Sequence, residues 1–485
     1  MPCQLPADCL NEIFEYLERD KVTLYSCLLV NRLWCEVSVR ILWRNVWNAK
    51  PIAYGRIRPY SRHRRLKVKP AILNTLIACL PNNSKTHLLE KGILNSTQIS
   101  KTPLFDYISF CKVLSIHVIG QMIIDVFKNQ KYLTKEIIKM FMNKISSVKK
   151  LSYYTNNSNT VNLSFLRYPG AKDCLTNLSK LSCNSNVKPS FFYKLSQMCH
   201  NIQSLTIEFK GVVSAGLKDL ISSQNNLKHL SLTQTYGIID WTDIIPSLSK
   251  HSNTLIKLKI YGSEYYYRNR PLSFVTKFTN LQELVLSFHY NYFNELNNKL
   301  QTIIFPHLQI LKFPHSCPED EILIKFLENN GKNLKELYIV NNNDSDSLNL
   351  AIAEFCPNME SLSILFKSDK LEALKVILNN CQQLKSIETQ YYPSLLSEKE
   401  LLEALAKYSP KNFRRLKLIN YYSDSKLVPE DLEEFLTNWK NRVPQRSFSF
   451  IFKGFKNSLE NKEGIKRVFE KYEKLGIISK FDISL

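Results

Sequence analysis

One short phrase recurs along most of the chain and limits what this sequence can fold into. The phrase reads Asn-Leu-x-x-Leu-x-Leu, with substitutions, and its first apolar position advances from residue 178 to residue 413 in nine steps. The average step is about 26 residues. Ten copies in one register indicate a repeat architecture, in which each unit packs against its neighbours. The ten positions are Leu178, Ile202, Leu227, Leu255, Leu281, Leu308, Leu334, Met359, Leu384 and Phe413.

Each copy predicts one strand followed by one helix. Alternate residues of Leu-x-Leu point to one side of an extended chain, into the core, and the residue between them points outward. Helical patterns lie between the phrases, at 348–355, 371–378, 401–405, 430–441 and 459–474. Weaker copies of the phrase predict further strands at the two ends, at 113–116, 151–153, 448–450 and 481–483. We therefore expect the repeats to stack into a solenoid with a parallel sheet on its concave side.

The first 47 residues carry a different pattern, typical of three short helices. Leu10, Ile13, Phe14 and Leu17 fall on one face of the first helix, and Thr23 suits the N-cap of the second. Three short helices in about 45 residues make a core too small to be stable alone. They also leave more apolar surface than such a core can cover, so we expect a permanent partner.

This N-terminal pattern resembles the F-box over about residues 3–47. The motif positions present are Leu5-Pro6, Leu10, Ile13-Phe14, Leu17, Leu28-Leu29-Val30-Asn31-Arg32, Trp34 and Leu42-Trp43. In that family the module binds a Skp-type adaptor, which connects to a cullin and a RING subunit. The resemblance implies an adaptor-binding surface formed or supported by Leu5, Pro6, Leu10, Ile13, Leu28, Val30 and Trp34. A small helical cap that binds nothing is the alternative interpretation.

The repeats resemble those of leucine-rich-repeat proteins found behind F-boxes, particularly in fungi. They do not keep a fixed Cys or Asn after the strand, so the repeat subtype stays open. Together the two resemblances imply an α/β fold with an F-box at 1–47, a basic connector with the first helices at 48–105, and a right-handed repeat horseshoe with a C-terminal cap at 106–485. They imply a substrate receptor of an SCF-type ubiquitin ligase that binds an unknown protein target. An F-box scaffold outside any ligase and a nucleic-acid-binding repeat protein are the alternatives.

Because side chains alternate between the two faces of a strand, the sequence also identifies the strand residues that face away from the core. Their charges are mixed, which fits protein recognition better than the uniformly basic groove that a phosphate backbone requires. Exposed positions include Lys180, Ser182 and Glu283, and an insertion at 265–270 reads Tyr-Tyr-Tyr-Arg-Asn-Arg. An ordinary solvated sheet face is the alternative for any one residue. The candidates for target binding are Lys257, Lys259, Tyr261, Tyr338, Arg415 and Lys417.

The chain is strongly basic, with a net charge of +22 from 65 basic and 43 acidic residues. Such an excess favours acidic partners but says nothing of the fold. Seven of the 14 residues in 56–69 are Lys or Arg, a run that can attract nucleic acid or serve as a nuclear address. We favour a solvated connector, because the run lacks the aromatic interleaving of a stacking platform. Nucleic acid is therefore the less favoured partner.

The sequence lacks the motifs of common catalytic and metal sites. It has no Gly-x-x-x-x-Gly-Lys, His-Glu-x-x-His or Gly-x-Ser-x-Gly, and no Cys/His spacing for the zinc sites of a RING. Cys199 and His200 are adjacent, but neighbouring side chains rarely point at each other. We therefore expect no enzyme, cofactor or metal. The 12 scattered cysteines and the lack of a long apolar run predict reduced thiols in a cytoplasmic or nuclear protein without a membrane segment.

Overall fold

The computed structural model divides into two compact units, Met1–Leu227 and Lys228–Leu485, which we describe separately. The described residues are 5–47, 59–95, 103–127, 131–155, 165–234, 239–262, 272–288, 293–339, 346–366, 371–391, 396–420, 425, 427–442, 446–454 and 461–484. Within them, the side chains of 59–68, 294, 391 and 484 are not described.

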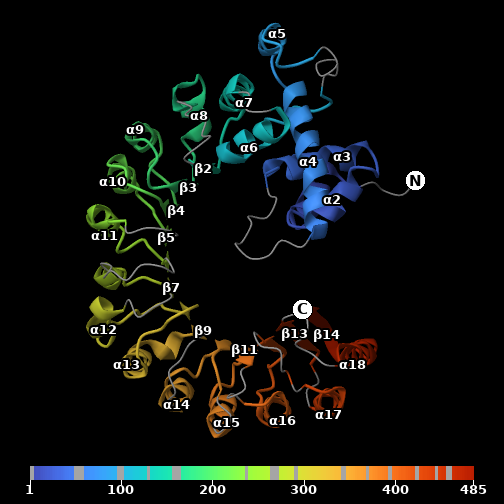
Figure 1. Ribbon diagram of the computed structural model, residues 1–485, viewed down its shortest axis with the longest axis vertical. Helices are drawn as coiled ribbons and strands as arrows, with labels where there is room; N and C mark the ends of the chain where they lie inside the picture. The colour runs from blue at the N-terminus through green and yellow to red at the C-terminus, as the bar shows by residue number, and fades with distance from the viewer. Residues whose placement is uncertain are drawn as a thin grey trace. The chain divides into compact units, whose positions relative to one another are not determined.

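The first unit begins with helices and continues into repeats of one strand and one or more helices (Figure 1). Its helices are α1 (Ala7–Glu15), α2 (Lys21–Cys27), α3 (Arg32–Arg44), α4 (Pro59–Ala78), α5 (Asn82–Glu90), α6 (Ile116–Phe127), α7 (Lys131–Lys144), α8 (Ala171–Leu175), α9 (Pro189–Met198) and α10 (Gly216–Ser222). Its strands are β1 (Val113–Ser115), β2 (Lys150–Tyr153), β3 (Lys180–Asn184) and β4 (Ser204–Phe209). Helix α4 lies within 48–105, the segment expected to hold the basic connector and the first helices.

The repeat phrase sets the register of these strands. β1 to β4 are parallel and paired in chain order, and one leucine of each strand lies beside the leucine of the next. These leucines are fully buried because they point toward the helices. In each strand, the residues directly before and after the buried leucine lie on the opposite side, which we call the open face of the sheet. The paired leucines are Leu114, Leu151, Leu181 and Leu205.

The second unit contains the remaining strands, β5 to β14, again parallel and in chain order. The strands are β5 (His229–Gln234), β6 (Lys257–Tyr261), β7 (Glu283–Ser287), β8 (Ile310–Phe313), β9 (Glu336–Ile339), β10 (Ser361–Ser363), β11 (Ser386–Tyr391), β12 (Arg415–Asn420), β13 (Phe448–Gly454) and β14 (Ile478–Ser484). The helices are α11 (Ile245–Ser249), α12 (Asn294–Leu300), α13 (Asp320–Asn330), α14 (Asp346–Phe355), α15 (Leu371–Asn380), α16 (Glu398–Tyr408), α17 (Pro429–Lys440) and α18 (Lys462–Lys474).

The predicted leucines again align across neighbouring strands. Leu258 lies beside Leu284, Leu284 beside Leu311, and Leu311 beside Leu337. The strands predicted from weak copies at both ends of the chain are present as β1, β2, β13 and β14, and the expected helices at 430–441 and 459–474 are α17 and α18. The predicted α/β fold class with parallel repeat strands behind N-terminal helices is confirmed.

Three of the asparagines that open the repeat phrase have a structural role that the pattern did not explain. The side-chain amide of Asn333 donates to the Pro306 carbonyl at 2.9 Å, and that of Asn358 donates to the Lys332 carbonyl at 2.9 Å. Asn280 makes the same contact with the Asn253 carbonyl at 2.8 Å. Each of these amides thus provides a hydrogen-bond donor for a backbone carbonyl of the preceding repeat. A carbonyl near a turn needs such a donor because the regular hydrogen bonds of a helix end there.

Candidate functional site

The N-terminal helices α1 to α3 form a small core of their own. Leu10 and Phe14 of α1 pack with Leu24 of α2 and Ile41 of α3. The ring of Phe14 meets the edge of Trp34 at 5.1 Å between centroids. This core contains only a few side chains, so contacts among these side chains hold α1, α2 and α3 together.

Polar contacts define where these helices begin and how they are joined. The Asp20 carboxylate accepts from the Thr23 N–H at 3.2 Å, so Asp20 is the N-cap and Thr23, predicted as the cap, is the third residue of α2. Two hydrogen bonds of 2.5 Å join the Arg44 guanidinium of α3 to the Glu15 carboxylate of α1. The hydrogen bond with Arg44 holds the pKa of Glu15 below its ordinary value, because it favours the charged carboxylate.

Large apolar side chains remain exposed on these helices. On α1, Ile13 and Tyr16 face away from the buried side. At the spacing i, i+3, i+7, Val22, Tyr25 and Leu29 share one side of α2 and its last turn, and all are exposed. Tyr16 and Leu29 are both 88% exposed. We name the exposed apolar residues of the N-terminal helices the docking face: Leu5, Ile13, Tyr16, Val22, Tyr25, Leu29 and Val30.

The residues predicted to bind an adaptor divide into three groups. Leu5, Pro6, Ile13 and Val30 are exposed and Leu28 and Trp34 are half-buried, whereas Leu10 is 1% exposed and can only support the surface from within. Whether they bind an adaptor stays a prediction. The docking face also contains four residues outside this predicted set. Helical periodicity could have found them, because they occupy the positions left over by the buried stripe: Tyr16, Val22, Tyr25 and Leu29.

The N-terminal helices are joined to the first repeat by specific contacts within the first unit. The Trp47 indole N–H donates to the Val113 carbonyl of β1 at 2.7 Å, and the Lys112 N–H donates to the Arg44 carbonyl at 3.0 Å. Trp47 is buried. Aromatic contacts extend the junction, between Trp43 and Tyr107 at 4.7 Å and between Trp47 and Phe141 at 5.8 Å. The edge of β1 is thereby covered by the end of the helical module.

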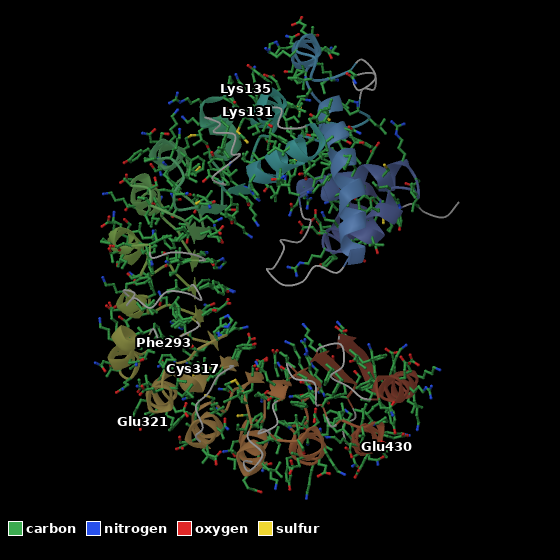
Figure 2. All side chains as sticks on the ribbon, viewed as in Figure 1. Lys131, Lys135, Phe293, Cys317, Glu321 and Glu430 are labelled. Carbon is green, nitrogen blue, oxygen red and sulfur yellow. The ribbon has the colours of Figure 1, made fainter. Side chains whose placement is uncertain are left out.

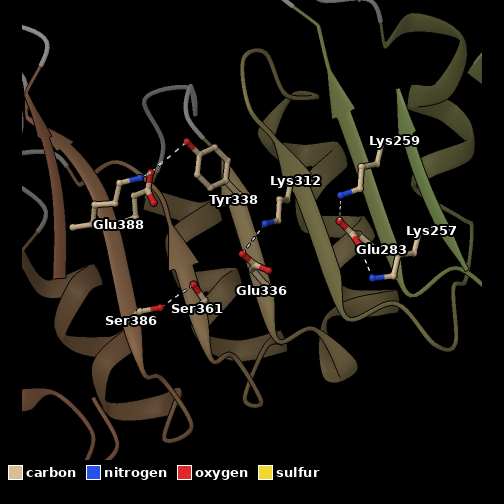
Figure 3. Close-up of polar contacts among 10 residues, drawn as sticks. Lys257, Lys259, Glu283, Lys312, Glu336, Tyr338, Ser361, Ser386 and Glu388 are labelled. Carbon is tan, nitrogen blue, oxygen red and sulfur yellow. Dashed lines mark hydrogen bonds and ion pairs between the residues drawn. The ribbon is translucent and has the colours of Figure 1, made fainter. Parts of the chain in front are cut away.

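On the open face of the second unit, lysines are paired with glutamates of adjacent strands. Figure 3 shows Glu283 of β7 between Lys257, at 3.2 Å, and Lys259, at 2.5 Å, both from β6. Lys312 likewise meets Glu336 of the next strand at 2.7 Å. Each pair bridges two neighbouring strands, directly across for Lys257 and diagonally for Lys259 and Lys312, so the opposite charges on this face neutralise one another locally.

Glu283 was expected to be exposed, but it is only 7% exposed. The two lysine side chains lie against it, and its neighbour Val285 on the same face is also buried. Burial alone would raise the pKa of Glu283, but hydrogen bonds from Lys259 and Lys257 outweigh it and hold the pKa below its ordinary value. Glu283 therefore stabilises the sheet face and is not an accessible recognition group.

The six residues predicted to bind a target are found in different settings. Lys257, Lys259 and Lys417 are ion-paired, the last with Glu388 at 2.7 Å. Tyr261 and Tyr338 are half-buried, and the Tyr338 hydroxyl lies 3.5 Å from Glu388. Arg415 is exposed and makes no ion pair with any described residue. Target binding by these residues stays a prediction, and the aromatic insertion at 265–270 lies outside the described residues.

A polar groove of about 490 Å³ lies where strands β8 to β11 begin. The amides of Asn333 and Asn358, which hold neighbouring repeats together, are part of its wall, with Lys335 and Glu360 between them. Glu360 is hydrogen-bonded to Lys385 at 2.5 Å. Because these polar groups are hydrogen-bonded between repeats, we attribute the groove to the stacking of neighbouring repeats.

The Cys199–His200 pair does not form a nucleophile and base. Cys199 is fully buried, and its thiol donates to the Leu175 carbonyl at 3.1 Å. Burial raises the pKa of Cys199 to about 12, so no thiolate is available at neutral pH. The exposed His200 ring lies 3.4 Å from the Ser223 carbonyl. The cysteine occupies a helix end and contacts the preceding repeat, which is a packing role.

The described residues contain no cluster of His, Cys, Asp and Glu able to hold a metal ion. The eleven described cysteines are free thiols, and all but Cys9 and Cys35 are at least nine-tenths buried. Within the same residues, no helix combines the length and apolar character needed to cross a membrane.

Comparison with known proteins identifies the N-terminal module. Residues 2–49 match the family model of F-box-like domains, so the chain carries an F-box-like domain at its N-terminus. Two solved structures with partial similarity are the leucine-rich repeat-containing protein LegL7 from Legionella pneumophila (15% identity, 64% of this chain, 96% of that chain, TM-score 0.36) and a chain of the yeast Rad7–Elc1 complex (12% identity, 95% of this chain, 97% of that chain, TM-score 0.38). The sequence matches no curated protein. The repeat assignment rests on the strand register described above.

Proposed function

We propose that this protein is the substrate-recognition subunit of an SCF-type ubiquitin ligase. The docking face of the F-box-like domain binds a Skp-type adaptor, and the repeats bind a protein target. The adaptor connects the protein to a cullin and a RING subunit, which supply the ubiquitin chemistry in the cytoplasm or nucleus. The protein itself then acts by proximity, because holding the target near a charged ubiquitin carrier raises their effective concentration.

One observation carries this proposal, namely the amount of apolar surface that the F-box-like domain leaves uncovered. Seven of the 17 large hydrophobic side chains exposed in the described chain belong to residues 5–30. A small monomeric domain rarely exposes such a concentration unless a partner covers it. The end of the domain contacts the first repeat through Trp47 and Arg44, and the side chains of the docking face are not buried by that contact.

The test is co-purification of the full chain with a Skp-type adaptor and a cullin–RING pair. Ile13→Asp should abolish adaptor recovery, because it places a charge in the middle of an apolar contact. Leu350→Asp is the matched control, since Leu350 is exposed to a similar extent on α14, outside the domain. Adaptor binding that survives Ile13→Asp would refute the assignment of the docking face.

The same experiment separates the scaffold alternative. A ligase receptor recovers the cullin together with the adaptor, and its target accumulates when the protein is deleted. An F-box scaffold outside a ligase recovers the adaptor alone and stabilises no target on deletion. Recovery of adaptor without cullin would therefore replace the receptor function by the scaffold function.

A further inference from the structure

Four lysines lie together where the first three strands begin. Lys112 immediately precedes β1 and Lys149 immediately precedes β2, whereas Lys150 opens β2 and Lys180 opens β3. Their backbones are hydrogen-bonded to one another, with the Lys149 N–H donating to the Lys112 carbonyl at 2.7 Å and the Lys180 N–H to the Lys149 carbonyl at 2.9 Å. Since neighbouring strands are about 4.8 Å apart, this lysine patch extends about 10 Å across the sheet.

Among the described residues, no Asp or Glu is ion-paired with the lysine patch. None of its four side chains makes an ion pair or hydrogen bond with another described residue. Strands β1 to β3 and the residues just before them contain no Asp or Glu. The next strand carries Glu208, which is ion-paired with Lys210 at 2.9 Å. The first unit therefore presents unbalanced positive charge at this place, whereas the lysines on β6 and β8 of the second unit are paired.

Hydroxyl groups adjoin Lys150 and Lys180 on the open face. Ser152 follows Lys150 by two residues and lies in register with Ser182, which follows Lys180 by two. Ser182 is half-buried and is hydrogen-bonded to Tyr154. Burial raises the pKa of Tyr154 to about 12, so the phenol remains a neutral neighbour. Cations beside neutral hydroxyls favour an oxyanion over any cationic or apolar group.

Resting on the proposed function, we infer that the lysine patch binds a carboxylate-rich segment of the protein target, laid in extended form across the starts of β1 to β3. The lysines come from the starts of three neighbouring strands and are spread across the sheet, so several separate carboxylates fit them better than a single phosphate. In an extended chain, side chains on one side recur about every 7 Å. Acidic residues at alternate positions therefore match a row about 10 Å long.

A nucleic acid fits this place less well. A single strand requires cations along its whole track and aromatic side chains on which bases stack. The row ends at β4, where Ser204 occupies the position in register with Lys180, and the rings of Tyr154 and His117 are packed edge-on at 4.9 Å. The length of the row and the occupied ring both favour a short polypeptide segment.

The test measures binding of a fluorescein-labelled peptide with Glu at every second position to the full-length protein by fluorescence anisotropy. Lys150→Gln with Lys180→Gln should weaken binding by about fivefold or more at low salt, because each exposed charge pair contributes modestly. Lys131→Gln with Lys135→Gln is the matched control, since it removes the same charge from the outer helix α7 (Figure 2). The control should bind as wild type, and both variants should keep the wild-type circular dichroism spectrum.

Three results would overturn the inference. The first is equal weakening by the patch and the control variants, which indicates general charge attraction only. The second is tighter binding of a peptide of equal charge carrying one phosphoserine, which assigns the patch to phosphate. The third is tighter, patch-dependent binding of single-stranded DNA. Adaptor binding is measured in parallel: its absence in wild type would refute the ligase receptor function while leaving patch-dependent peptide binding intact.

Discussion

The apolar stripe of α2 offers the sharpest test of the docking face. Val22 is 69% exposed and Leu29 is 88% exposed. Full burial of a Val or Leu side chain contributes about 1.5–3 kcal/mol, so scaling by the exposed fractions gives about 2.5–4.5 kcal/mol for covering both. This is an upper limit, because an adaptor need not cover them completely. If half of that surface is buried, Val22→Ser with Leu29→Ser raises the dissociation constant by about 10-fold to 40-fold.

Isothermal titration calorimetry with a purified Skp-type adaptor measures this change directly. Val212→Ser with Leu475→Ser is the matched control, because these side chains are 82% and 54% exposed and lie outside the F-box-like domain. Both double variants should unfold at nearly the wild-type urea concentration, since exposed substitutions usually change stability by less than about 0.5 kcal/mol.

Two outcomes would refute the reasoning. An unchanged dissociation constant for the Val22/Leu29 variant would mean that the α2 stripe is not part of the contact. Equal weakening in the control variant would mean that general loss of apolar surface, and not the docking face, controls binding.

Three further predictions concern stability, each measured by urea unfolding followed by circular dichroism. Trp47→Ala should lower the free energy of unfolding by about 3–5 kcal/mol, because it removes both the buried ring and the hydrogen bond to the Val113 carbonyl. Trp47→Phe should lower it by only about 1 kcal/mol, because phenylalanine loses the hydrogen bond but keeps most of the packing. Equal effects of the two substitutions would contradict the junction described. Glu283→Gln should cost about 1–2 kcal/mol at neutral pH, with the exposure of its lysine partners keeping the value small. Because the folded pKa of Glu283 is lowered, its contribution is complete above the unfolded value of about 4.3 and is lost as the pH falls through the folded pKa, so wild type and variant should converge in acid. Asn333→Ala should cost about 0.5–1.5 kcal/mol, because it removes the hydrogen bond to the Pro306 carbonyl. The control is Asn379→Ala, an exposed asparagine of α15, and a loss no larger than that of the control would count against the inter-repeat role.

The fold could be predicted from the sequence because the repeat phrase carries its own register. Leu258, Leu284 and Leu311 recur at the same place in the phrase and lie side by side in the sheet. A one-residue slip would move every such leucine to the open face, so burial specifies the pairing strongly. Even the weak copies at Leu151 and Phe450 are in register with their neighbours, because alternation alone suffices where one face is buried.

The accessibility of single residues could not be predicted in the same way. Period two correctly assigned Glu283 to the open face, but its burial depends on two lysines of the neighbouring strand, 24 and 26 residues earlier in the chain. The adaptor-binding set predicted from the F-box motif likewise included Leu10, which is in the core, and left out Leu29, which is exposed. A motif records which residue types recur, whereas exposure depends on which helix faces the packing leaves uncovered.

The availability of single lysines could not be predicted from the sequence either. The sequence contains lysines throughout the repeats, and Lys257 and Lys259, which are close together, were among the candidates for target binding. Pairing across strands decides which lysines are available, and it neutralises Lys257 and Lys259 but leaves Lys150 and Lys180 without a partner among the described residues. Cross-strand neighbours come from different repeats, so charge counting within one repeat cannot identify the free cations.

The junction at Trp47 determines how the two halves of the proposed function should be tested. The end of the F-box-like domain supplies the acceptor for the Lys112 N–H and the donor for the Val113 carbonyl, so it also closes the edge of β1. Deleting residues 1–47 would leave these backbone groups unpaired and remove the rings that pack against Tyr107 and Phe141. Loss of target binding after such a deletion would therefore report damage to the first repeats, beside the lysine patch, as readily as loss of the adaptor. Substitutions on the docking face, such as Ile13→Asp, remove adaptor contacts without touching the junction, and they alone separate adaptor binding from target binding.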